Sequence, residues 1–191
     1  MFLETPRLIL RKFREEDFAD YCTFSLGDPE RDRMMGRSPL NTVEDVRLNF
    51  NWLKDKEERG YALVLKETNK VIGNLTVYNR GFSSEEHPEL SGKKGFSFSL
   101  GISNEYKRQG LIFEATQDVI NHLFLKEDAD YVGAGHFSYN IPSRELQKKL
   151  GFSYLFSETI DLFGETVTEL NNILWKKDWK IKYKSHEKGH S

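Results

Sequence analysis

The stretch SNEYKRQGLI (Ser103–Ile112) links a strand-like segment to the strongest helical pattern in the chain. A helix that begins here offers free backbone N–H groups at the positive end of its dipole. Lys107 and Arg108 add positive charge, and Gly110 lets the backbone approach a ligand without an intervening side chain. The stretch therefore predicts a phosphate-type anion site, with a merely solvated helix start as the alternative.

The segments on either side of this stretch support a strand–loop–helix unit. GFSFSLGI (residues 95–102) alternates large apolar residues with small ones, which predicts a strand with one apolar face. Residues 110–126 place apolar side chains at helical spacing. The predicted anion site therefore lies where a strand is followed by a helix.

The remaining pattern predicts an α/β protein with a mixed sheet of about seven strands flanked by about four helices. Asn41 is expected to cap a helix with Glu44, and residues 28–40 are expected to form a loop or broken turn. The other expected strands cover residues 7–13, 61–66, 71–78, 131–138, 154–163 and 166–175, and the other expected helices residues 15–26 and 142–150. The late helical crossovers predict some parallel pairing, and the hairpins predict antiparallel pairing.

Composition is typical of a single soluble domain. The chain has 191 residues, 38% hydrophobic and 30% charged, with a net charge of −2. This balance does not indicate nucleic acid as an obligatory partner, and no stretch is long enough to cross a membrane. Residues 1–178 are expected to form the domain, and residues 179–191 a flexible, Lys-rich tail.

The single cysteine, Cys22, bears on the cellular compartment. It can form no internal disulfide and cannot hold a metal alone, so no metal site is expected. Its place in an apolar periodic stretch predicts a core residue rather than a nucleophile. Glu4 and Pro6 interrupt the apolar N-terminus, which is unlike a signal peptide. A cytoplasmic location is therefore expected.

Four motifs occur in a characteristic order: ETPRL from Glu4, VLKETNKVIG (residues 64–73), the 105–115 turn, and N-x-x-S-x-x-L-x-x-K-L-G-F (residues 140–152). Together they resemble the GCN5-related N-acetyltransferase (GNAT) superfamily, especially its ribosomal-protein N-acetyltransferase (Rim-type) branch, over nearly the whole chain. The resemblance implies an acyltransferase that moves the acetyl group of acetyl-CoA to a primary amine, either a protein N-terminus or a small amine. A non-catalytic protein of the same fold that binds acyl-CoA or a partner is the alternative.

The family's cofactor loop follows the pattern Arg/Gln-x-x-Gly-x-Gly/Ala. Gly110 matches its central glycine, while Ile112 replaces the last small residue. By the resemblance, residues 98–102 splay from residues 131–137 and leave a slot for the pantetheine arm. The implied acetyl-CoA contacts are Leu100, Gly101, Ile102, Lys107, Arg108, Gln109, Gly110, Leu111, Ile112 and Asn140.

The resemblance also implies an acid for the departing thiolate. Gln147 stands where many family members carry a tyrosine acid, and it cannot act as one. The Rim-type branch uses the serine of N-x-x-S, which is Ser143 here, as acid or thiolate stabiliser. A helix N-cap or first-turn serine is an equally open interpretation.

The implied base is an acidic residue on the strand after Gly151-Phe152, because Ser97 replaces the family's frequent strand glutamate. Asp161 lies nearest that place and Glu158 is the reserve, with solvent-facing acids as the alternative.

Two further residues have open roles. Glu114 matches a family residue with a surface or substrate-facing role, and His136 is either a further base or a structural histidine. The amine pocket is expected among the first helix region, residues 34–40, residues 80–94 and the last hairpin. An edge strand in that hairpin could also pair in a homodimer.

Overall fold

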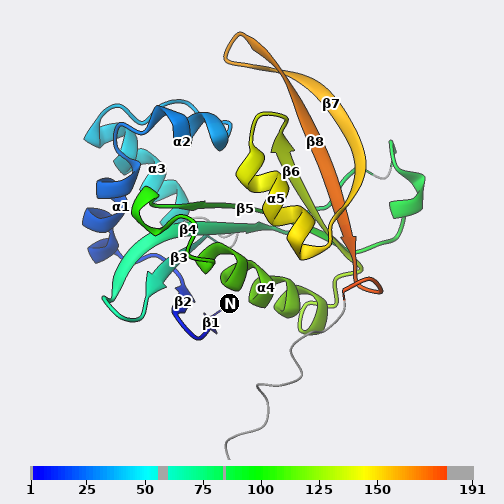
Figure 1. The fold of residues 1–191 in the computed structure, drawn as a ribbon, viewed down its shortest axis with the longest axis horizontal. Helices are drawn as coiled ribbons and strands as arrows, with labels where there is room; N and C mark the ends of the chain where they lie inside the picture. Colours follow the sequence, from blue (N-terminus) through cyan, green and yellow to red (C-terminus); the bar gives the residue numbers. More distant parts are fainter. Residues whose placement is uncertain (1, 56–59, 84, 180–191) are drawn as a thin grey trace, which may run out of the picture.

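The computed structural model describes residues 2–55, 60–83 and 85–179, which form one mixed sheet of eight strands with five α-helices (Figure 1). The strands are β1 (Leu3–Glu4), β2 (Leu8–Arg11), β3 (Gly60–Leu65), β4 (Lys70–Tyr78), β5 (Gly95–Ile102), β6 (Tyr131–Phe137), β7 (Ser153–Leu162) and β8 (Glu165–Trp175). The helices are α1 (Phe18–Ser25), α2 (Pro29–Met34), α3 (Val43–Asp55), α4 (Leu111–Leu125) and α5 (Ile141–Leu150). The predicted α/β class is confirmed.

The strands lie in the order β1-β2-β3-β4-β5-β6-β8-β7. Neighbours from β1 to β5 are antiparallel, and the crossover through α4 makes β5 and β6 parallel. The last strand, β8, lies between β6 and β7 and is antiparallel to both. Both expected kinds of pairing are therefore present.

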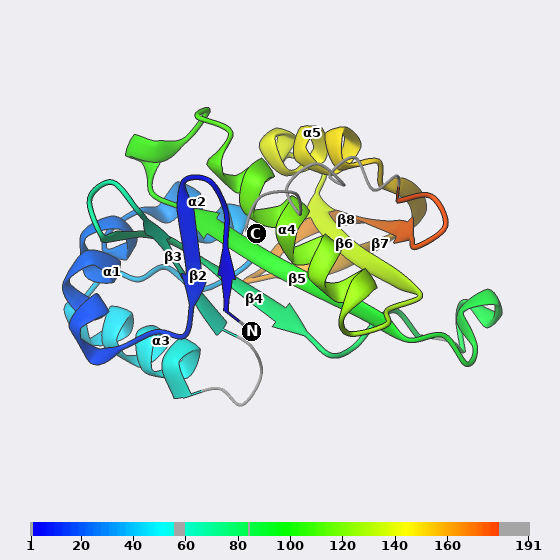
Figure 2. The same ribbon diagram turned by 90° about the horizontal axis from the view of Figure 1, so that it is seen from below.

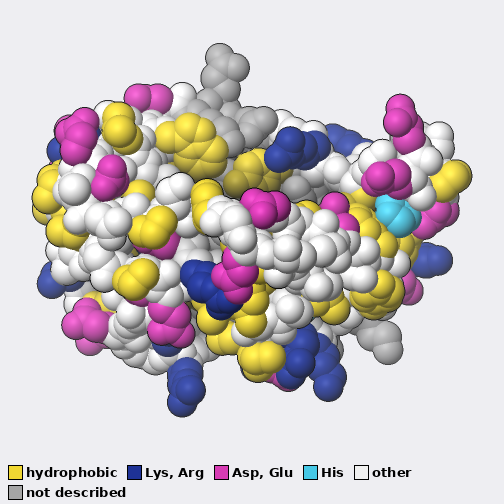
Figure 3. All heavy atoms as spheres, turned by 90° about the horizontal axis from the view of Figure 1, so that it is seen from above, with side chains coloured by type: hydrophobic (Ala, Val, Ile, Leu, Met, Phe, Trp, Pro, Cys, Tyr) yellow, Lys and Arg dark blue, Asp and Glu magenta, His cyan; other side chains and the backbone are white. Residues whose placement is uncertain are grey.

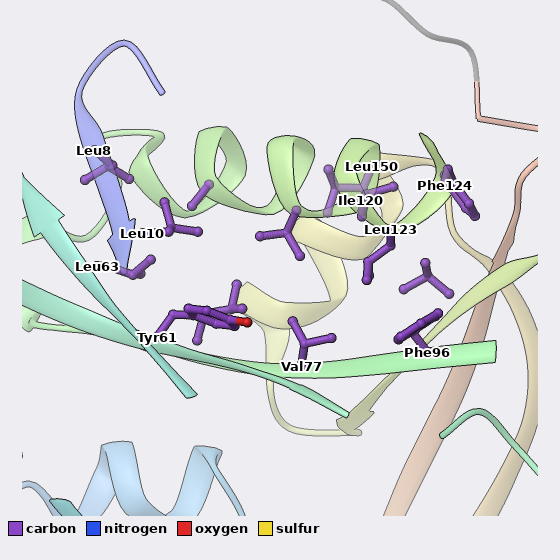
Figure 4. Packing of buried hydrophobic residues seen from close by; sticks show 14 of the residues in the cluster. Leu8, Leu10, Tyr61, Leu63, Val77, Phe96, Ile120, Leu123, Phe124 and Leu150 are labelled. Atoms are coloured by element: carbon purple, nitrogen blue, oxygen red, sulfur yellow. The ribbon is translucent and has the colours of Figure 1, made fainter. Parts of the chain in front are cut away.

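Alternating side chains of β3 divide the core between the two faces of the sheet. Tyr61 and Leu63 are buried in the cluster that contains α4, whereas Ala62 and Val64 are buried in the cluster that contains α1 and α3. Figure 4 shows the first cluster between α4 and the strands, and Figure 2 shows α4 running across that face. Cys22 is half-buried and packs against the second cluster, as expected for a core-facing residue.

Two local predictions are wrong. Residues 28–40 are not all loop, because α2 begins at Pro29 after Asp28, whose side chain accepts a hydrogen bond from the Arg31 amide at 2.9 Å. The α3 helix is capped by Thr42 rather than Asn41. Thr42 Oγ1 accepts from the Asp45 amide at 3.1 Å, and Asp45 accepts in return from the Thr42 amide at 2.9 Å.

The predicted splay is confirmed and opens the sheet at its centre. β5 and β6 pair only from Gly95–Ser97 to Tyr131–Gly133. Beyond that point β6, β8 and β7 turn away from β4 and β5, and α2 and α5 flank the opening (Figure 1). The edge of residues 98–102 therefore lacks a strand partner on that side within the described chain.

The expected tail begins at Trp179, which belongs to the folded part. Its indole N–H donates to Asn121 Oδ1 at 2.7 Å, and its ring lies 6.2 Å from that of Phe124 on α4. The rest of the expected tail, residues 180–191, lies outside the described residues. Across the described ranges, no helix combines the length and apolar character needed to span a membrane.

Candidate active site

The loop before α4 has the geometry of an anion cradle. Arg108 and Gly110 both have positive φ, 62° and 77°, so the chain reverses direction just before the helix. Gly110 is the N-cap residue, and no side chain caps the helix start. The first helical hydrogen bond runs from the Glu114 amide to the Gly110 carbonyl. The preceding amides, from Leu111 on, are therefore available to a ligand.

A cavity of about 610 Å³ lies beside this loop, between α2, β5 and the start of α5. Nine of the ten predicted acetyl-CoA contacts line it: Leu100, Gly101, Ile102, Lys107, Arg108, Gly110, Leu111, Ile112 and Asn140. The tenth, Gln109, is not among the lining residues, because its side chain donates to the Glu105 carbonyl at 3.0 Å. We call this space the donor cavity.

Ile112, the unusual residue of the loop, does not close the donor cavity. Its side chain is half-buried and packs against the main core, while it also contributes to the cavity wall. As the second residue of α4, it keeps its amide at the helix start. The substitution therefore leaves the cradle's backbone donors in place.

A second cavity of about 690 Å³ lies on the other side of the splayed strands. We call it the acceptor cavity. Its walls include Trp52, Tyr78, Phe82, His136 and Glu169. The two cavities have six lining residues in common: Met34, Met35, Leu100, Asn140, Ser143 and Leu146. They therefore meet beside the unpaired part of β5.

Asn140 and Ser143 lie at this junction at the start of α5. Asn140 is the N-cap residue, and its Oδ1 accepts from the Ser143 amide at 3.1 Å. Asn140 Nδ2 donates to the Met34 carbonyl at 3.1 Å, which ties α5 to α2. Ser143 is thus a first-turn residue but not the cap, and its hydroxyl is not used to cap the helix.

Gln147 lies one helical turn after Ser143 and is buried. Its Nε2 donates to Ser143 Oγ at 3.1 Å and to the Gly135 carbonyl at 3.2 Å. Its Oε1 accepts from Asn172 Nδ2 at 2.7 Å. This amide therefore connects α5 to β6 and β8.

His136 adjoins the same network. Its Nδ1 lies 3.3 Å from both Gln147 Oε1 and Asn172 Nδ2, and its buried Nε2 has no hydrogen-bond partner among the described residues. Burial lowers the pKa of His136, and nearby Arg144 lowers it further, against the opposing hydrogen bond to Gln147. The imidazole is therefore neutral at neutral pH.

The acidic group that reaches the acceptor cavity is Glu169 on β8, which sequence reasoning missed. Its side chain is half-buried, and burial, followed by repulsion from its cross-strand neighbour Glu158, raises its pKa. Only the sheet order could have revealed it, because Glu169 gains its position by pairing opposite Phe137 of β6.

The structure does not bring Asp161, the predicted base, to either cavity. Asp161 is exposed near the tip of the β7–β8 hairpin, where its Oδ1 accepts from the Gly164 amide at 3.0 Å. Glu158, the reserve, is also exposed and accepts from Asn171 at 3.3 Å. Ser97 lines the acceptor cavity, but its hydroxyl donates to the Arg80 carbonyl.

Glu114 has a structural role in the N-terminal segment. Its carboxylate accepts from the Arg7 amide at 2.9 Å and from Arg7 Nε at 2.7 Å, and it also accepts from the Thr5 hydroxyl. Burial raises the pKa of Glu114, but these hydrogen bonds outweigh it and the net pKa is lowered. Both side-chain oxygens are engaged, so this acid is not directed at a substrate.

Two contacts join the α2 helix to the β7–β8 hairpin and to the β6–α5 loop. Arg33 Nη2 lies 2.8 Å from Glu165 Oε1 in the hairpin, and the Tyr139 hydroxyl donates to the Arg33 carbonyl at 3.1 Å. Figure 3 views the molecule from the top of Figure 1 and shows acidic and basic side chains interspersed on this face.

No metal-binding group of three or more His, Cys, Asp or Glu side chains occurs in the part that the structure describes.

Residues 7–153 match the acetyltransferase (GNAT) domain family. The chain therefore belongs to this family, and acetyl transfer is its class of reaction.

Full-length similarities agree with this assignment. The uncharacterized N-acetyltransferase YnaD of Bacillus subtilis is 21% identical over 183 residues, covering 94% of this chain and 99% of YnaD. A GNAT-family acetyltransferase from Bacillus anthracis has the same fold, with a TM-score of 0.79, 19% identity, and coverage of 93% and 99%. The ribosomal-protein-S5-alanine acetyltransferase of Vibrio fischeri is also similar in fold, with a TM-score of 0.68, 16% identity, and coverage of 94% and 99%.

Proposed function

We propose that this protein transfers the acetyl group of acetyl-CoA to a primary amine by direct attack of the amine on the thioester. The observation that carries the proposal is the meeting of the donor and acceptor cavities at Leu100 and Ser143. Two ligands that enter from opposite sides of the splay would contact each other only there. Such an arrangement holds two reactants in one geometry, which is itself a large part of catalysis.

The lining of the donor cavity suits the chemistry of acetyl-CoA. Free amides at the start of α4, with Lys107 and Arg108 beside them, would bind the pyrophosphate. The unpaired edge of β5 would bind the pantetheine arm through its backbone groups. An N–H group near Leu100 would donate to the thioester oxygen as negative charge develops on it.

Ser143 and Glu169 are the proposed proton-handling groups. The amine nitrogen forms a bond to the acetyl carbon as the carbon–sulfur bond breaks, and the departing thiolate receives a hydrogen bond from the Ser143 hydroxyl before it is protonated. Glu169 accepts the proton that the amine loses and passes it to solvent. A carboxyl group whose pKa is raised towards neutrality is a better base for this step.

The acceptor is proposed to be a protein N-terminus or a small amine. Likeness in fold to the Vibrio fischeri ribosomal-protein-S5-alanine acetyltransferase supports including N-terminal peptides among the substrates to test. The cavity's Glu169 carboxylate and aromatic walls suit a cationic amine next to an apolar group.

The test is calorimetric titration with acetyl-CoA, followed by a thiol-release assay with small amines and N-terminal peptides. We expect binding and amine-dependent release of CoA, with acetylated amine detected by mass spectrometry. Binding without release from any amine would support the non-catalytic alternative. Absence of binding would refute the proposed donor site.

Ser143→Ala separates a chemical role from a structural one. If the hydroxyl assists the thiolate, kcat falls by roughly tenfold or more while the Kd for acetyl-CoA changes little. Because Asn140 provides the cap, the substitution should leave the melting temperature nearly unchanged. Unaltered kcat would remove Ser143 from the mechanism.

A further inference from the structure

We infer that Gln147 is a positioning residue that fixes the polarity of Ser143, so that the serine hydroxyl can only donate its hydrogen toward the junction of the two cavities. The inference rests on the proposed function, because it assumes that CoA sulfur occupies that junction. It assigns a role to the buried side-chain amide of Gln147, which stands where many family members carry a tyrosine acid.

The orientation of the Gln147 amide follows from its neighbours. The Gly135 carbonyl can only accept a hydrogen bond, so the Gln147 atom 3.2 Å from it must be the nitrogen. The opposite atom accepts from Asn172 Nδ2 at 2.7 Å, as an amide oxygen does. A flipped Gln147 amide would set two acceptors against each other at the Gly135 carbonyl, whichever way the Asn172 amide is turned.

The hydrogens of this amide are completely used. Nε2 carries two, and it has two acceptors, the Gly135 carbonyl and Ser143 Oγ at 3.1 Å. Gln147 is only 4% exposed, so water has little access to compete for them. The amide is therefore a fixed donor to Ser143 in this conformation.

A hydroxyl that accepts from a fixed donor must send its own hydrogen elsewhere. Serine has one hydrogen and two lone pairs, and the bond from Gln147 occupies one lone pair. No acceptor for the Ser143 hydrogen occurs among the described residues. Because Ser143 lines both cavities, that hydrogen is available to a ligand at their junction. Accepting one hydrogen bond also makes the hydroxyl a better donor in the next.

Gln147→Glu reverses this polarity with almost no change in shape. An ionised carboxylate has no hydrogen to donate, and a protonated one has a single hydrogen that the Gly135 carbonyl requires. In either state Ser143 would turn its hydrogen towards residue 147 and away from the junction. The substitution should therefore reproduce the loss caused by Ser143→Ala while leaving the serine in place.

The first measurement is the pKa of the thiol of bound CoA, followed by thiolate absorbance in a pH titration. We expect the wild-type protein to lower that pKa relative to free CoA, and Gln147→Glu and Ser143→Ala to raise it to a common value, by roughly one unit. Gln117→Glu, the same chemical change on α4 outside both cavities, should leave it unchanged.

Turnover provides the second measurement. With acetyl-CoA, Gln147→Glu should lower kcat by the same factor as Ser143→Ala, the KM for acetyl-CoA should stay within about twofold, and the double variant should be no slower. The assay is repeated with an aryl thioester as the acetyl donor, whose thiol is far more acidic. The difference in kcat between wild type and variants should then be smaller, because the departing thiolate needs less stabilisation. A purely structural defect would slow both donors equally.

A wild-type thiol pKa and wild-type kcat in Gln147→Glu would overturn the inference and leave the proposed function standing. Effects of the two single variants that multiply in the double variant would also overturn it. If wild-type protein fails to bind CoA, the proposed function falls and the inference with it. Should Gln147→Glu not fold, Gln147→Met tests the same point, with a thiol pKa above the wild-type value expected and an unchanged value contradicting the inference.

Discussion

Arg7 Nη1 donates a hydrogen bond to the carbonyl oxygen of Gln109 at 2.9 Å, so the N-terminal segment holds the loop that begins α4. A trans peptide points its N–H opposite to its C=O, and the Gly110 amide therefore faces away from Arg7. Gly110 lines the donor cavity, and on its other side it lines a hollow that Arg7 also lines. The contact thus fixes the orientation of the peptide that immediately precedes the free amides of α4.

Arg7→Gln should weaken acetyl-CoA binding by roughly three- to tenfold, because the Gln109–Gly110 peptide loses its charged anchor. Binding of S-acetylpantetheine, which lacks the pyrophosphate, should not change. Calorimetry with both donors measures the difference. Arg14→Gln, at an exposed arginine whose ion pair with Glu16 spans 3.8 Å, is the control. Equal losses with both donors would contradict a role specific to the phosphate loop.

Substitutions at Gly110 separate backbone strain from charge. Gly110→Asn tolerates the positive φ better than most residues and should keep measurable acetyl-CoA binding. Gly110→Asp has nearly the same shape but places a negative charge at the cradle, and it should abolish binding at low salt. Titrations at two salt concentrations should show that added salt partly restores binding to the aspartate variant only. Equal affinities of the two variants would rule out a phosphate at this loop.

Carboxyl-to-amide changes on the last two strands identify the base. Glu169→Gln should lower kcat/KM by roughly a hundredfold and remove the acidic limb of its pH profile. Asp161→Asn should leave both unchanged, because Asp161 only braces the hairpin turn. The reverse result would establish Asp161 as the base, as the family resemblance implies.

Glu169 should also affect stability with a defined sign. Its folded-state pKa is raised, so the folded state binds more protons than the unfolded state as pH rises through this range, and stability falls. Glu169→Gln should therefore raise the melting temperature at neutral pH and have little effect below the ordinary carboxyl pKa. If Glu169→Gln raised the melting temperature equally at both pH values, ionised Glu169 would not destabilise the folded protein.

Thr42→Ala should destabilise the protein by about 1 kcal/mol, because it removes the hydroxyl that caps α3. Asn41→Ala should change the free energy of unfolding by less than about half of that, since the capping side chain is that of Thr42 and the alanine keeps the backbone amide of residue 41. Urea unfolding of the two variants measures both values. If Asn41→Ala lowered the free energy of unfolding more than Thr42→Ala, the capping residue of α3 would be Asn41.

Local features of the fold were predictable from the sequence, and features set by strand order were not. Alternation and helical spacing located α4 and the sheet strands from β2 to β8 within a few residues, but not the two-residue β1. The α2 helix was missed because it has only six residues and its start depends on Asp28 and Pro29. In the same way, two adjacent residues, Asn41 and Thr42, compete as caps, and only backbone direction decides between them.

The same distinction between local features and features set by strand order applies to the candidate site. The donor loop is contiguous in sequence, so its residues could be named before the fold was known. Glu169 could not, because it reaches the acceptor cavity only after β8 inserts between β6 and β7. A family pattern pointed to the strand after Gly151-Phe152, and the acid that lines the cavity lies on the partner strand of that hairpin.

The position of β8 also determines when the protein becomes competent during synthesis. β7 pairs only with β8 in the described sheet, and β8 leaves the ribosome after the other strands of that sheet. The donor loop and α4 can form while β7 still has no partner. The acceptor cavity, which Glu169 lines, must wait for β8. A nascent chain that ends before residue 165 would therefore have the elements of the donor cavity but no complete place for an amine.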